Sequence, residues 1–114
     1  MKKAMLSTAA VVVATLALGL LKGSQAGPAA NGQYQVKIDN FSFGPAILTV
    51  PVGATVTWIN QDDVPHTVVG TDSKAIKSPV LDTDQTFAYT FAQKGTYDYY
   101  CSIHPKMTGK VVVH

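Results

Sequence analysis

The chain has 114 residues, of which 46% are hydrophobic and 14% charged, with nine Lys, no Arg and a formal net charge of +2. Three of the nine Lys lie within the first 22 residues, and residues 27–114 carry one more Asp than Lys, so the basic character gives no argument for nucleic acid as a partner. The single cysteine excludes a disulfide within the chain.

The first 26 residues have the pattern of a secretory signal peptide. Two lysines follow Met1, residues 4–21 are small and apolar, and Ser24-Gln25-Ala26 provides a small-x-small cleavage site. We expect residues 1–26 to be cleaved after export, so that residues 27–114 work outside the cytoplasm without inserting into the membrane. A retained membrane anchor is the alternative, because the apolar run approaches the length of about 17 to 20 residues that a spanning helix needs.

Apolar and polar residues alternate along much of the chain after residue 32, which is typical of strands with one buried face. Residues 33–39 place Tyr34, Val36 and Ile38 on one side. Runs of β-branched and aromatic residues between turn signals predict further strands. These strands are expected at residues 47–50, 55–59, 86–91, 96–100 and 108–113.

Residues 70–85 show no sustained period and are predicted to form a long connection. Seven to eight short strands, regularly spaced turns and no convincing helix after the export signal indicate one all-β domain over residues 27–114. The predicted fold is an antiparallel Greek-key β-sandwich.

Three potential metal ligands of different kinds are spaced two residues apart near the C-terminus: Cys101, His104 and Met107. A thiolate, an imidazole and a thioether are soft or borderline donors, and on one short loop they suit copper better than other biological metals. His104 lies in the middle of this loop, so we expect it to be the ligand nearest the surface.

A copper site with these donors requires a second imidazole. His66 is a better candidate than the terminal His114, which is free to fray. Loops at one end of a sandwich lie together, so His66 can approach the loop that begins at Cys101. Two imidazoles and a thiolate with a weak axial thioether accept both Cu(I) and Cu(II), which predicts electron transfer rather than enzyme activity.

Other functions use part of the same donor set. A zinc site favours a nitrogen, oxygen or thiolate ligand over the thioether of Met107. A nucleophile pair of Cys101 and His104 lacks an orienting carboxylate nearby in the sequence. A periplasmic copper carrier or storage protein is the alternative to electron transfer, although a carrier needs an open site for metal exchange.

Four segments resemble small blue-copper proteins of the cupredoxin family: residues 53–60, 64–66, 95–101 and 104–113. The gap between His104 and Met107 is similar to that of amicyanin, since plastocyanin and pseudoazurin relatives have a longer one. The resemblance implies one copper ion per chain with the ligands His66, Cys101, His104 and Met107. It also implies a bacterial periplasmic monomer whose electron donor and acceptor are redox proteins such as a dehydrogenase or a c-type cytochrome.

Two positions depart from the usual pattern of the family. Thr67 stands where relatives usually carry Asn; its N–H remains available to the thiolate, but its side chain has a shorter reach between loops. Ile103 stands where amicyanin and plastocyanin relatives usually carry Pro, which has no N–H. We predict that the Ile103 N–H hydrogen-bonds to the Cys101 sulfur and raises the reduction potential. The hydrogen bond withdraws electron density from the thiolate, and this weakens the donation of the sulfur to Cu(II) more than its donation to Cu(I).

Overall fold

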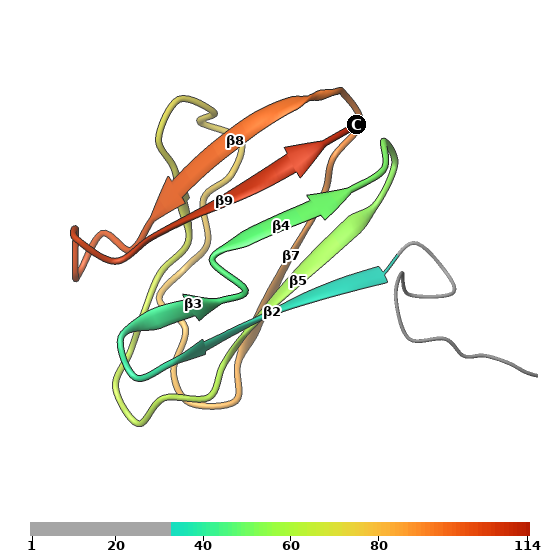
Figure 1. Ribbon diagram of the computed structural model, residues 1–114. Coiled ribbons are helices and arrows are strands. Elements are labelled where there is room, and N and C mark those ends of the chain that lie inside the picture. Colours follow the sequence, from blue (N-terminus) through green and yellow to red (C-terminus); the bar gives the residue numbers. More distant parts are fainter. Residues whose placement is uncertain (1–32) are drawn as a thin grey trace, which may run out of the picture.

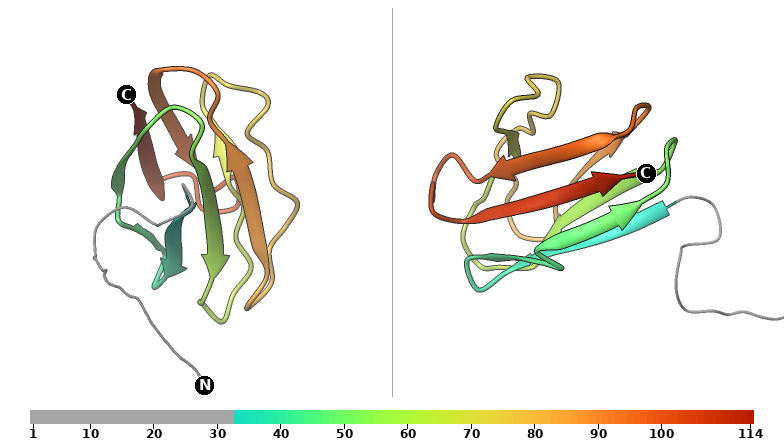
Figure 2. Two further views of the ribbon diagram at one scale, coloured as in Figure 1. Left: turned by 90° about the vertical axis from the view of Figure 1, so that its right-hand side faces the viewer. Right: turned by 45° about the horizontal axis from the view of Figure 1, so that its top comes forward.

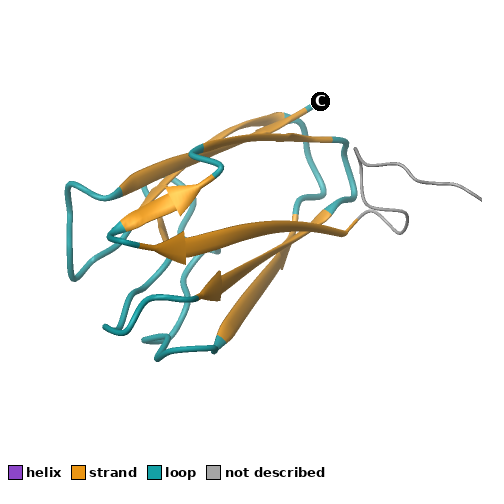
Figure 3. Ribbon diagram, turned by 60° about the horizontal axis from the view of Figure 1, so that its bottom comes forward, coloured by secondary structure: helices purple, strands orange, loops and turns teal. Residues whose placement is uncertain are grey.

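The computed structural model describes residues 33–114, so the predicted signal peptide lies outside the described residues. This part of the chain consists of strands and loops that build two packed sheets (Figure 1, Figure 3). It contains no helix with the length and apolarity that crossing a bilayer requires. The strands are β2 (Gln33–Asp39), β3 (Ser42–Gly44), β4 (Ile47–Val50), β5 (Thr55–Asn60), β6 (Val69–Gly70), β7 (Thr86–Thr90), β8 (Gly95–Tyr100) and β9 (Thr108–Val113).

The prediction of an all-β sandwich is confirmed, with one difference in strand pairing. One sheet has the order β3-β2-β5-β7 and the other has the order β4-β9-β8-β6 (Figure 2). Each sheet is mixed rather than purely antiparallel, because β2 pairs with β5, and β4 with β9, in parallel. After β3 the chain crosses to the second sheet as β4 and returns as β5. A crossover of this kind joins parallel neighbours, whereas a hairpin joins only antiparallel ones.

Alternate side chains of the strands fill the space between the two sheets. In β5, Val56, Trp58 and Asn60 have no exposed surface, and in β2 the same holds for Val36 and Ile38. In β2 the buried positions lie on the face that the period-two pattern predicts. The two sheets therefore form a packed frame. Burial of one face of each sheet fixes the register of its strands, and these strands hold the loops at both ends of the frame.

The predicted long connection after Gly70 contains little regular structure, but it follows the sandwich closely. Val69 forms an isolated bridge with Lys77, and Leu81 forms another with His66. Ile76 and Leu81 belong to the buried core. The part of the connection that contains Leu81 thus packs beside the segment that carries His66.

Candidate metal centre

The spacing of Cys101, His104 and Met107 corresponds to two consecutive turns between β8 and β9. The His104 N–H donates to the Cys101 carbonyl at 3.2 Å, and the Met107 N–H donates to the His104 carbonyl at 2.8 Å. The Cys101 N–H in turn donates to the Met107 carbonyl at 3.0 Å, which closes the loop. Each two-residue gap is therefore one turn, and the chain returns to Cys101 as it reaches Met107.

His66 approaches this loop from the connection that follows β5. Its N–H donates to the Leu81 carbonyl at 3.1 Å, and its carbonyl accepts from the Leu81 N–H at 2.8 Å. The side-chain amide of Asn60 donates to the carbonyls of Val64 and Leu81 at 2.9 and 2.8 Å. Because Asn60 is completely buried at the end of β5, these hydrogen bonds hold the segment that carries His66 against the rigid sheet.

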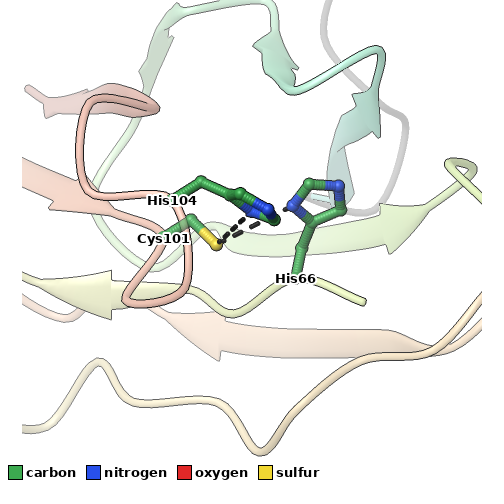
Figure 4. Close-up of side chains that lie close together, drawn as sticks. All are labelled: His66, Cys101 and His104. Carbon is green, nitrogen blue, oxygen red and sulfur yellow. Dashed lines mark hydrogen bonds between the residues drawn. The ribbon is translucent and has the colours of Figure 1, made fainter. Parts of the chain in front are cut away.

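Three donor atoms converge on one point (Figure 4). The Cys101 Sγ lies 3.7 Å from Nδ1 of His66 and 3.6 Å from Nδ1 of His104, and all three donor atoms lie within 4.8 Å of one another. Such separations fit donors that share one ion with bonds of about 2.0 to 2.3 Å. One thiolate and two imidazoles suit copper, so these residues fit the metal that the sequence predicts.

The cysteine is held in the form that binds metal. Burial by itself raises the pKa of the Cys101 thiol, but hydrogen bonds outweigh burial and lower this pKa to about 6. In decreasing order of effect, these hydrogen bonds come from the Thr67 N–H, His66, His104 and the Ile103 N–H. A thiol with this pKa is mainly thiolate at neutral pH, and thiolate is the ligand form of cysteine.

Asp62, which the sequence analysis did not single out, fixes the orientation of His66. Its Oδ2 lies 2.9 Å from Nε2 of His66, and both side chains are buried. The hydrogen bond to His66 is the largest cause that lowers the pKa of Asp62 below its usual value. With its Nε2–H bound to a carboxylate, the imidazole presents the Nδ1 lone pair toward Cys101, as expected for a metal-binding histidine with a carboxylate partner.

Phe41 is a second residue that the sequence analysis did not connect with the site. Asn40 and Phe41 have φ angles of 52° and 57° in the tight turn between β2 and β3. A bulky residue rarely adopts this conformation, and here the Phe41 N–H donates to Oδ2 of Asp62 at 3.1 Å. The Phe41 ring stands edge-on to His66 and His104, with ring centroids 5.7 and 5.0 Å apart. The turn thus places an aromatic ring over both imidazoles.

The four predicted ligands differ in exposure as expected. His66 and Cys101 have no exposed surface and Met107 is 6% exposed, whereas His104 is half-buried. His104 is therefore the ligand nearest the surface. His114 lies at the opposite end of β9 from the loop and pairs with Val50 and Val52 through its backbone, so it is remote from the three converging donors.

The predicted contact between Ile103 and the thiolate receives limited support. The Ile103 N–H is the weakest of the causes that lower the pKa of Cys101. Among the described residues, the hydrogen bonds to Sγ with ordinary geometry come from Thr67 and the two imidazoles. The effect of Ile103 on the reduction potential stays a prediction, with a magnitude smaller than that of the Thr67 N–H.

Replacing Ile103 with Pro is expected to lower the reduction potential slightly. Proline removes the N–H, so the thiolate donates more electron density and favours the oxidised metal. Voltammetry of the wild type and the Ile103→Pro variant measures the change, and Ile103→Ala, which keeps the N–H, serves as the control. A potential that is unchanged or higher in Ile103→Pro contradicts the prediction.

Comparison with known proteins is consistent with this geometry. The protein-family model described as a cupredoxin-like domain matches residues 8–113 of this sequence. Amicyanin of Paracoccus denitrificans is 43% identical over 88 residues, which cover 74% of this chain and 67% of that protein. Amicyanin-alpha of Methylorubrum extorquens is 40% identical over 105 residues, 88% of this chain and 86% of that protein. A purple cupredoxin from Nitrosopumilus maritimus superposes with a TM-score of 0.69 and 37% identity, covering 71% of this chain and 99% of that chain.

Proposed function

Because the chain belongs to the cupredoxin family, we infer that it is a small blue-copper protein that carries single electrons between redox partners. The observation that carries this function is the convergence of one thiolate and two imidazoles, with Sγ to Nδ1 distances of 3.7 and 3.6 Å. Copper in such a site supplies a one-electron couple between Cu(II) and Cu(I). The residues that would hold the copper ion are His66, Cys101, His104 and Met107, of which the Met107 thioether would be the weakest donor.

Burial of the site favours electron transfer over copper delivery. Cys101 and His66 have no exposed surface, and each is tied to a neighbouring segment by backbone hydrogen bonds. A carrier or storage protein must exchange its metal, which requires ligands that can open. Such packing around Cys101 and His66 restrains the donors, so little reorganisation would accompany the arrival or departure of an electron.

The electron is proposed to enter and leave at His104. This imidazole, with Phe41, Pro105, Lys106 and Met107, lines a shallow hollow at the metal end of the sandwich. Apolar groups around a half-buried ligand allow a partner to approach closely while water is excluded. Redox proteins, such as a dehydrogenase as donor and a c-type cytochrome as acceptor, are the proposed partners of a monomeric carrier without enzymatic activity.

Residues 1–26 are proposed to direct the chain to the periplasm and to be removed there. The basic start, the apolar run and the small-x-small site support export. Copper would then be bound after translocation, by residues that lie far apart in the unfolded chain.

Adding Cu(II) to the metal-free protein is expected to produce an intense visible band from thiolate-to-copper charge transfer. The band should saturate at one copper per chain, because the described residues bring one thiolate and two imidazoles together once. A Cu(II) titration monitored by visible spectroscopy measures the intensity of the band and the number of copper ions per chain. The His114→Ala variant should behave as the wild type does. A pale or colourless product would instead indicate a copper carrier or a zinc site.

A further inference from the structure

Thr67 and Ser102 form a polar contact between the two loops that bear the ligands. The Ser102 N–H donates to Oγ1 of Thr67 at 2.8 Å, and the two hydroxyl oxygens lie 2.8 Å apart. Thr67 is 5% exposed and sits beside the sulfur of Cys101. Its N–H donates to Sγ at 3.3 Å, and its Oγ1 lies 3.8 Å from the same sulfur. Thr67 thus offers the thiolate two donors from one residue.

The direction of the hydroxyl protons follows from counting donors and acceptors. A hydroxyl has one proton to donate and two lone pairs that accept. One lone pair of Thr67 Oγ1 is occupied by the Ser102 N–H. If the Ser102 hydroxyl donates to the other lone pair, the Thr67 proton is directed to Sγ and all contacts are satisfied. If Thr67 donates to Ser102 instead, the only donor that Thr67 offers to the sulfur is its backbone N–H.

We propose that Ser102 donates to Thr67 and that Thr67 donates to the Cys101 sulfur, so that this hydroxyl pair favours the reduced state of the copper site. The inference rests on the proposed function. A hydrogen bond to an anionic acceptor is stronger than one between neutral groups, which favours the arrangement that points a proton at the thiolate. Ser102 acts through Thr67 and is therefore a positioning residue.

The effect on the potential has a definite sign. When Cu(II) gains one electron from a redox partner, no bond is made or broken in the protein, and the sulfur regains negative charge. A donor aimed at the sulfur then gains more in the reduced state than in the oxidised state. The Thr67 hydroxyl consequently raises the reduction potential in addition to the contribution of its N–H.

The main test is Thr67→Val, which removes the hydroxyl at nearly constant shape and keeps the backbone N–H. In the copper-loaded protein the potential is expected to fall, and the charge-transfer band is expected to move to longer wavelength. Thr67→Ser retains a hydroxyl and should restore both values toward those of the wild type. A potential and a band that are the same in Thr67→Val and the wild type overturn the proposal.

Ser102→Ala tests the direction of the hydroxyl pair. If Ser102 is the donor, its removal weakens the polarisation of the Thr67 hydroxyl, and the potential should fall by less than in Thr67→Val. If Thr67 is the donor to Ser102, the substitution releases its proton to the sulfur and the potential should rise. A rise therefore overturns the proposed arrangement.

Amide exchange gives a readout that does not depend on the redox couple. Ser102 is exposed, so its N–H is protected chiefly by Oγ1 of Thr67. In the reduced, copper-loaded protein, Thr67→Val should accelerate exchange at Ser102 by roughly tenfold, the loss of one hydrogen bond, and Thr67→Ser should not. Equal exchange in all three proteins contradicts the loop contact. If the Cu(II)-loaded wild type is blue but the potential and band of Thr67→Val are unshifted, only the hydroxyl proposal is overturned. If the Cu(II)-loaded wild type is colourless, the proposed function is overturned as well.

Discussion

Replacing Asp62 with Ala is expected to weaken Cu(II) binding by about 10- to 100-fold, the range typical for losing the carboxylate partner of a metal-binding histidine. The carboxylate accepts from His66 Nε2 at 2.9 Å in a buried position, and it also accepts from the Phe41 N–H. Without it, the imidazole loses both its fixed orientation and its most basic partner. Competition with a chelator measures the affinity.

The same substitution should raise the reduction potential. The carboxylate increases electron donation from the imidazole, which stabilises Cu(II) more than Cu(I), so its removal favours the reduced state. Asp62→Asn removes the charge of the carboxylate but retains an oxygen that can accept from His66. Its copper affinity and its reduction potential should lie between those of the wild type and Asp62→Ala.

Asp63 provides the matched control for Asp62. It is the adjacent carboxylate, but it is exposed, and its side chain makes no hydrogen bond among those of the described residues. Asp63→Ala therefore removes the same charge without touching His66. If Asp62→Ala and Asp63→Ala have the same affinity and potential, Asp62 has no role in positioning the ligand.

Replacing Gly109 with Ala is expected to destabilise the domain by about 3 kcal/mol, the upper part of the range for overpacking a core. Gly109 of β9 pairs with Tyr99 of β8, and the Tyr99 ring lies directly over it. A methyl group at Gly109 would overlap Cζ and the hydroxyl of Tyr99 and lie 2.8 Å from Cε1. The ring has little room to move, because it stands edge-on to Phe43 and Trp58, with centroids 4.7 and 5.3 Å away.

Urea unfolding of the metal-free protein measures this loss without a contribution from metal binding. Gly44→Ala is the matched control, since the nearest atom to its added methyl group is the Lys37 carbonyl oxygen at 3.9 Å. That substitution should have a small effect. A free energy of unfolding that is equal in the two variants would show that the Tyr99 ring moves at little cost.

Crowding at Gly109 also has a consequence for the copper site. Tyr99 precedes Cys101 by two residues, so a displacement of its ring is transmitted along β8 to the thiolate. We expect the charge-transfer band of Gly109→Ala to broaden or shift, whereas that of Gly44→Ala should match the wild type.

Local patterns in the sequence were sufficient for six of the eight strands that the structure describes and for three of the candidate donors; the short strands β3 and β6 were not predicted. Alternation in β2 reflects burial of one face, and this pattern is local because successive side chains of a strand point to opposite sides. The spacing of Cys101, His104 and Met107 is equally local, since the two consecutive turns span only the seven residues from Cys101 to Met107. The sandwich, the candidate ligands of the loop after β8 and the exposure of His104 followed from such patterns.

The parallel pairs and the environment of His66 depended on contacts between distant segments. The pairing of β2 with β5 requires the chain to pass through the second sheet between them. Asp62 precedes His66 by four residues in an irregular segment, where no fixed period relates spacing to contact. The contact between Asp62 and His66 depends on Asn60, which is buried at the end of β5 and folds that segment back on itself. The Oδ1 of Asn60 accepts from the Asp62 N–H.

The sequence alone determined the class of fold and the candidate donors, because strand periodicity and ligand chemistry are properties of short segments. Only the tertiary structure decided how those donors are tuned. Thr67 meets Ser102 across 35 positions of sequence, and Phe41 meets Asp62 across 21. Hydrogen bonds act over about 3 Å, so a residue affects the sulfur or the imidazole only after the packed sheets have brought its loop to the site.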